Sequence, residues 1–304
     1  YLKYNDISGD PEAIARNYLD RAMDYSFDKM IEKHIRQHQE VFRRVSLDLG
    51  DTPDIPTDER IGAKNLDNDP QLAALVFQFG RYLLISSSQP GTSPAHLQGL
   101  WNDKPTAPWE GKYTLNINAE MNYWPAEPTN LPEMHEALFR LVREVSVSGR
   151  KTAKVHYGAR GWVVHHNTDG WRATGPINKS DHGIWPMGGA WLLSHMWDHY
   201  DYNRDTAFLE ESYPLFKGSV RFYMYILTED PVTGKLIIPL SNSPEQGGLV
   251  AGAAMDNQLL RELFDNTIKT TEILNVDKAF RDSVLDFRNR LMPNQIGSWG
   301  QLQE

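Results

Sequence analysis

The sequence predicts an all-α fold whose helices are joined by long, aromatic-rich loops. Apolar residues recur with helical spacing in segments of mostly 14 to 23 residues, which are longer than the average globular helix. Strand signals are sparse, and many Trp residues stand between the helical segments, next to Gly, Pro, Asn or Asp. A chain of 304 residues can bury roughly 75% of its unfolded surface. These observations favour helix pairs whose loops gather at one end, as in a barrel or a bundle.

The expected helices can be placed in order along the chain. Residues 11–49 have the pattern of two helices or of one broken helix, and Pro11 suits a first helical turn. Further helices are expected at 70–87, 131–153, 185–200, 205–227, 253–274 and 278–291. The segment KLIIPL at 235–240 is the best strand candidate, and GWVVHH at 161–166 is a weaker one. No change of composition marks an internal boundary, so we expect residues 1–304 to be one segment of a single domain.

The composition argues against several kinds of partner. The 31 basic and 40 acidic residues give a net charge of −9, and no stripe of Lys or Arg suggests nucleic-acid binding. No run of about 18 apolar residues is present, so we expect no membrane partner. The chain has no Cys, which excludes disulfides and thiolate metal sites.

Two pairs of His residues stand four positions apart on predicted helices. The pairs are His34 with His38 and His195 with His199. A zinc-protease motif requires Glu directly after the first His, and that position is apolar in both pairs. We therefore expect exposed or packed His residues, no metal site and no cofactor.

The first distinctive loop, 89–115, leads into the stretch YTLNINAEMNYWPAE at 113–127, which places three amides among large apolar side chains. Burying an amide without partners costs roughly 1–3 kcal/mol. Asn116, Asn118 and Asn122 therefore need helix caps, turns, an ordered water or a polar ligand. The chemistry of these residues alone leaves the alternatives open.

The second loop, 158–184, contains VVHHNTDGW. It concentrates polar and aromatic functions in His165, His166, Asn167, Asp169 and Trp171. A carboxylate can fix the tautomer of a His, which leaves the other ring nitrogen for a ligand hydroxyl. We interpret this loop as facing a ligand, and the alternative is a hydrogen-bond network within the loop.

The third loop, 237–252, contains LSNSPEQGG, in which Glu245 follows Pro244 among small residues that allow a ligand to approach closely. A lone Glu in a loop is usually just solvated. If this loop meets the other two, the pocket would combine one carboxyl group, several amides and aromatic walls. That set suits glycoside hydrolysis, in which a protonated carboxyl group gives its proton to the leaving oxygen while a second group handles water.

Seven segments, in order, carry a resemblance to a known family. They are RVSLDLG with PTDERI (44–61), LVFQFGRYLLISSSQPGTSPAHLQGLWND (75–103), YTLNINAEMNYWPAEPTNL (113–131), GWVVHHNTDGW (161–171), WPMGGAWL (185–192), SPE (243–245) and GSWGQLQE (297–304). They resemble glycoside hydrolase family 95, the inverting 1,2-α-L-fucosidases with some α-L-galactosidases. The resemblance implies an (α/α)6 barrel of which this chain holds the N-terminal part, normally flanked by β-domains.

The resemblance also implies roles for single residues. Glu245 matches the general acid, and Asn116 and Asn118 match amides that position the attacking water together with an aspartate base. That aspartate belongs to a later family segment, so we expect it beyond Glu304 and expect this chain to be a piece of a longer protein. Asn122 keeps a structural interpretation. The candidates for holding the sugar are His165, His166, Asp169, Trp171 and Trp185.

The expected partner is thus a fucosylated oligosaccharide or glycan, and the family resemblance suggests an extracellular, cell-surface or periplasmic location. One alternative is α-L-galactosidase activity, because L-galactose differs from L-fucose only by a hydroxyl group on C6. Another is a non-catalytic carbohydrate-binding protein that keeps the pocket.

Overall fold

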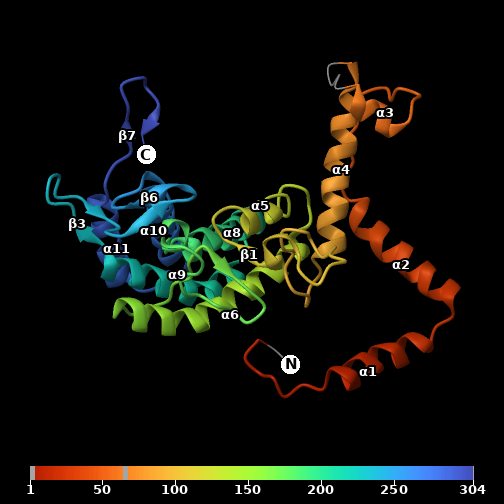
Figure 1. The fold of residues 1–304 in the computed structure, drawn as a ribbon, viewed down its shortest axis with the longest axis horizontal. Coiled ribbons are helices and arrows are strands. Elements are labelled where there is room, and N and C mark those ends of the chain that lie inside the picture. The colour runs from red at the N-terminus through yellow and green to blue at the C-terminus, as the bar shows by residue number, and fades with distance from the viewer. Residues whose placement is uncertain (1–3, 64–67, 304) are drawn as a thin grey trace. The chain divides into compact units, whose positions relative to one another are not determined.

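The computed structural model describes residues 4–63 and 68–303, which are mostly helical (Figure 1). This is compatible with the predicted all-α class. The chain divides into two compact units, Tyr1–Ala95 with Pro125–Ala137 (unit 1) and His96–Trp124 with Leu138–Glu304 (unit 2). Within the described ranges, no helix combines the length and the apolar character needed to cross a membrane.

The described part of unit 1 is mainly helical. Its helices are α1 (Pro11–Met23), α2 (Phe27–Phe42), α3 (Thr57–Gly62), α4 (Pro70–Ser87) and the first six residues of α6 (Pro132–Tyr157). The first helical segment is therefore two helices. The break falls before Ser26, whose hydroxyl accepts a hydrogen bond from the main-chain N–H of Lys29 at 3.3 Å and so caps α2.

A buried arginine on α4 ties unit 1 together. The side chain of Arg81, which is 1% exposed, donates hydrogen bonds to the main-chain oxygens of Val41, Phe42, Val45 and Thr129 at 2.7–3.3 Å. The last carbonyl groups of a helix have no partner within that helix. Arg81 therefore supplies donors to the C-terminal end of α2.

Unit 2 contains the longer helices and the loops that the sequence singled out. Its helices are α5 (Asn118–Tyr123), the rest of α6, α7 (Ser180–Gly183), α8 (Gly188–Asn203), α9 (Thr206–Ile226), α10 (Ala254–Leu274), α11 (Lys278–Arg290) and the short 3-10 segment η2 (Pro108–Gly111). Helix α10 packs against α8, α9 and α11 (Figure 1). The core includes the fully buried side chains of Leu192, Phe216, Phe222 and Phe264.

Two glycines make room for a buried tryptophan in this core. Trp162 is 2% exposed, and its indole N–H donates to the main-chain oxygen of Leu215 at 2.9 Å. A Cβ atom on Gly189 or on Gly218 would lie 2.8 Å from the Trp162 ring. Larger residues at these positions of α8 and α9 would displace the ring.

The strands of the described residues form two-stranded antiparallel sheets. The pairs are β1 (Tyr113–Thr114) with β2 (Asn167–Thr168), β3 (Thr228–Glu229) with β4 (Leu236–Ile237), β5 (Ser241–Ser243) with β6 (Gln246–Val250), and β7 (Gln295–Ile296) with β8 (Leu302–Gln303). The strand predicted at 235–240 is confirmed only in its first half, by β4.

The weaker strand prediction, at 161–166, is wrong. Residues 162–166 of this segment are buried, but the segment forms no ladder with a neighbouring strand. The N–H of Val163 donates to the oxygen of Gly149 at 3.3 Å, and the N–H of His165 donates to that of Thr174 at 3.2 Å. Carbonyl oxygens of a helix and of a loop thus accept the hydrogen bonds from main-chain N–H groups that would otherwise pair with a neighbouring strand.

The remaining predicted helices are confirmed, with ends that differ by a few residues. Helix α4 has the predicted bounds, α6 continues to Tyr157, and α8 begins at Gly188, three residues later than expected. The His pairs lie on helices, as expected. The ring of His38 stacks on Phe42, and the ring of His199 packs against Phe208.

Candidate functional site

The pairing of β1 with β2 brings two of the singled-out loops together in unit 2. Thr114 lies opposite Asn167, and the main-chain N–H of Leu115 donates to the oxygen of His166 at 2.6 Å. The amides that follow β1 and the imidazole that precedes β2 therefore reach the same hollow.

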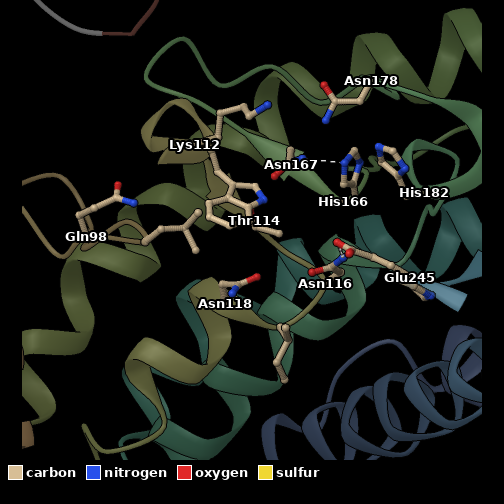
Figure 2. A pocket seen from close by; sticks show the side chains of 14 residues that line it. Gln98, Lys112, Thr114, Asn116, Asn118, His166, Asn167, Asn178, His182 and Glu245 are labelled. Atoms are coloured by element: carbon tan, nitrogen blue, oxygen red, sulfur yellow. Dashed lines mark hydrogen bonds between the residues drawn. The ribbon is translucent and has the colours of Figure 1, made fainter. Parts of the chain in front are cut away.

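The hairpin of β5 and β6 brings the third loop to this hollow. Its turn carries Glu245, and the amide nitrogen Nδ2 of Asn116 donates a hydrogen bond to Oε1 of Glu245 at 3.3 Å (Figure 2). These residues are 129 positions apart in the sequence. Asn116 is buried, with 8% of its surface exposed, whereas Glu245 is exposed.

The three loops enclose an open pocket of about 720 Å³. This volume falls in the range of small-molecule sites, roughly 300–1,000 Å³. Amides, imidazoles and a single carboxylate dominate the lining, which consists of Leu97, Gln98, Trp109, Lys112, Thr114, Asn116, Ile117, Asn118, His166, Asn167, Asn178, His182, Pro244 and Glu245.

The electrostatics of the pocket keep His166 neutral. Burial lowers the pKa of His166 to about 4, and the neighbouring His182 and Lys112 act in the same direction. The carboxylate of Glu245 partly opposes this lowering. The amide nitrogen of Asn167 lies 2.6 Å from Nε2 of His166 and donates to it (Figure 2). A neutral imidazole in this place can bind a hydroxyl group without adding charge to the pocket.

His165 faces away from the pocket and holds its loop in place. It is fully buried, with Nε2 at 2.6 Å from the hydroxyl group of Tyr157 and Nδ1 at 2.7 Å from the main-chain oxygen of Thr174. Burial lowers the pKa of His165 to about 4. Asp169 also acts within the loop, because its Oδ1 accepts from the main-chain N–H groups of Trp171 at 2.9 Å and Ala173 at 3.1 Å.

The two tryptophans proposed for the sugar do not line this pocket either. Trp185 is fully buried, and Trp171 is 56% exposed but lies outside the lining. A contact between the sugar and Trp171, Trp185, His165 or Asp169 stays a prediction. Asn122 donates to the main-chain oxygen of His96 at 3.1 Å and does not line the pocket, which agrees with its structural interpretation.

The pocket also contains side chains that sequence reasoning did not single out. They are Gln98, Trp109, Lys112, Thr114, Asn178 and His182. Lys112 and Thr114 flank Tyr113 directly before the Asn-rich block, so their nearness to that block was the available signal. The others reach the pocket through the closure of long loops, which no local pattern shows.

The helical scaffold and the pocket together define a class of protein, one that binds a small polar ligand among amides and imidazoles and offers it one carboxyl group. The comparison with known proteins is more specific. Residues 26–304 match the glycosyl hydrolase family 95 catalytic domain, and the chain belongs to this family.

Similar curated proteins carry fucosidase names. The chain is 37% identical over 314 aligned residues to Alpha-L-fucosidase 2 of Arabidopsis thaliana, and the match covers 97% of this chain and 37% of that protein. It is 35% identical to Probable alpha-fucosidase A of Aspergillus niger, over 92% of this chain and 37% of that protein. The chain thus spans little more than a third of the length of these relatives.

A solved structure shares the fold. A putative kojibiose phosphorylase from the human microbiome matches with a TM-score of 0.65 at 12% sequence identity, over 95% of this chain and 41% of that chain. At such low identity the likeness concerns the arrangement of the helices only.

Proposed function

We propose that the protein containing this chain is an inverting exo-glycoside hydrolase that releases terminal α-1,2-linked L-fucose from glycans. The observation that carries the proposal is the hydrogen bond between Asn116 and Glu245 inside an open polar pocket. Family membership and the fucosidase names of the relatives support the choice of substrate. The proposal takes the helices of this chain as part of an (α/α)6 barrel, with which the mostly helical fold is compatible.

In the proposed reaction Glu245 is the general acid. The bond from Asn116 occupies Oε1, so Oε2 is the atom that carries the proton. As the bond between C1 of fucose and the glycosidic oxygen breaks, Oε2 gives its proton to that oxygen, which takes the bonding electron pair. The leaving sugar therefore departs as a neutral alcohol.

The attacking water is held by the amides on the other side of C1. Nδ2 of Asn116 donates to Glu245, and Oδ1 of Asn116, the acceptor atom of the amide, can accept a hydrogen bond from water. Asn118 also lines the pocket and supplies a second acceptor. An amide cannot take the proton of the water, so the proposal assigns that step to an aspartate in the part of the protein beyond this chain. The water oxygen bonds to C1 from the face opposite the leaving group, which inverts the anomeric configuration.

The test uses the full-length protein and an α-1,2-fucosylated trisaccharide. We expect Glu245→Gln to lower kcat about 10²- to 10⁴-fold with KM changed only a few-fold, because general acid catalysis typically contributes that factor. Glu210→Gln, at an exposed position of α9, is the matched control and should keep the wild-type kcat. NMR of the first product should show β-L-fucose.

Each other outcome contradicts part of the proposal. Wild-type kcat in Glu245→Gln would remove the acid assignment, and an α-anomer as first product would remove inversion. Sugar binding without turnover would point to a carbohydrate-binding protein instead. A higher kcat/KM on the matching α-L-galactoside would assign that sugar in place of L-fucose.

A further inference from the structure

The rim of the pocket differs in character from its floor. On the floor, Asn116, His166 and Asn167 are 8%, 2% and 4% exposed. At the rim, Trp109 lines the same pocket but is 75% exposed. A large apolar ring that remains open to solvent at the mouth of a polar pocket has no partner within the core. It offers a flat surface beside hydrogen-bonding groups.

The backbone holds Trp109 in a conformation that bulky residues rarely adopt. Its φ is 51° and that of the next residue, Glu110, is 58°, both in the left-handed region. Such residues persist where surrounding contacts fix them, and they cluster at ligand sites. Here Nε2 of Gln98 donates to the oxygen of Pro108 at 3.2 Å, and Nζ of Lys112 pairs with Glu110 at 2.6 Å.

The geometry points to a binding subsite for the leaving group of the substrate. This inference rests on the proposed function. The fucosyl residue must contact Asn116 and Asn118 for its C1 to be attacked, so it occupies the floor. The sugar on the other side of the glycosidic bond must then extend towards the exposed rim. We propose that this sugar stacks the apolar face of its pyranose ring on the indole of Trp109. Gln98 and Lys112, which also line the pocket, provide hydrogen bonds to its hydroxyl groups.

The experiment compares two substrates in the full-length protein. One is the α-1,2-fucosylated trisaccharide, and the other is α-L-fucosyl fluoride, whose leaving group is a single atom and cannot stack. We expect Trp109→Ala to lower the ratio of kcat/KM for the trisaccharide to kcat/KM for the fluoride about tenfold, a factor that corresponds to about 1.4 kcal/mol. Trp109→Phe should restore most of that ratio. Trp299, which is 91% exposed and does not line the pocket, provides the control variant Trp299→Ala with a wild-type ratio.

The outcomes separate this subsite from the proposed function. If Trp109→Ala leaves the ratio unchanged, including the case in which kcat/KM falls equally for both substrates, the subsite is overturned while the proposed hydrolase function stands. If the wild type hydrolyses neither substrate, the proposed function fails, and calorimetry then tests the subsite. In that measurement the trisaccharide should bind more tightly than free L-fucose, and Trp109→Ala should abolish the difference. Equal affinities for the two sugars in the wild type would overturn the subsite.

Discussion

A buried carboxyl group behind the β5–β6 hairpin should make the stability of the protein depend on pH. Asp256 lies in the first turn of α10 and is fully buried. Burial raises the pKa of Asp256 to about 7, although the hydroxyl group of Ser241 and the indole N–H of Trp185 act in the opposite direction. The ordinary pKa of such a carboxyl group is 3.8. The folded protein therefore keeps a proton that the unfolded chain releases.

The sign and the size of the effect follow from linkage. Between about pH 4 and pH 7 the folded state binds more protons at Asp256 than the unfolded state, so the free energy of unfolding falls as the pH rises. The difference between 3.8 and about 7, at 1.36 kcal/mol per pH unit, corresponds to a loss of about 4 kcal/mol that is complete near pH 8. Asp256→Asn keeps the shape of the side chain and removes its titration.

The assay is denaturation of the full-length protein and of Asp256→Asn from pH 4 to pH 8. Other groups titrate equally in both proteins, so the quantity to follow is the stability of the variant minus that of the wild type. We expect it to rise by about 4 kcal/mol from pH 4 to pH 8. Asp20→Asn, on the exposed surface of α1, should give a difference that changes little with pH. A pH-independent difference for Asp256→Asn would refute the reasoning.

Three further predictions, two on packing and one on hydrogen bonding, can be checked by calorimetric Tm. Gly161 has a φ of 88°, and a Cβ atom there would lie 2.0 Å from the main-chain oxygen of Gly218, so Gly161→Ala should destabilise by about 3 kcal/mol. Gly80→Ala lies on α4, where a Cβ atom meets nothing within 4 Å, so it should instead stabilise the protein by about 0.5–1 kcal/mol. Equal changes in stability for the two glycine substitutions would contradict the packing argument. Arg81→Met leaves several main-chain oxygens without their donor, so it should destabilise the protein by about 2–4 kcal/mol and speed proteolysis at the end of α2. An unchanged Tm and cleavage rate would rule out a stabilising role for Arg81 at the end of α2.

The helices were predictable because their apolar periodicity is a local property. The same reasoning failed at 161–166, where Val163 and Val164 have the β-branched, apolar character of a strand. Burial alone explains those residues, since both are at most 1% exposed. A strand also requires a partner edge, and the presence of one depends on distant parts of the chain. Here Gly149, within α6, accepts the hydrogen bond from the N–H of Val163 instead.

The candidate site was predictable in part. The chemistry of Asn116, Asn118 and Glu245 suggested a pocket, but only the family resemblance gave them roles. Their meeting depends on sheets whose strands are two to five residues long, and strands this short leave almost no alternation to detect in a sequence. For the same reason the sequence did not indicate His182, which reaches the pocket from α7.

The dense motif HHNTD shows why a loop rich in chemical groups predicts a site but not its lining. His166 lines the pocket, while the neighbouring His165 is buried in the core, where Tyr157 and Thr174 engage both of its ring nitrogens. These two hydrogen bonds attach the segment to the core. The residues that face the pocket therefore do not need to form hydrogen bonds with the core themselves. A polar loop that positions a ligand needs one set of side chains facing the ligand and another set bonded to the core. The sequence of the loop alone does not show which side chains belong to which set, because that depends on how the core packs against the loop.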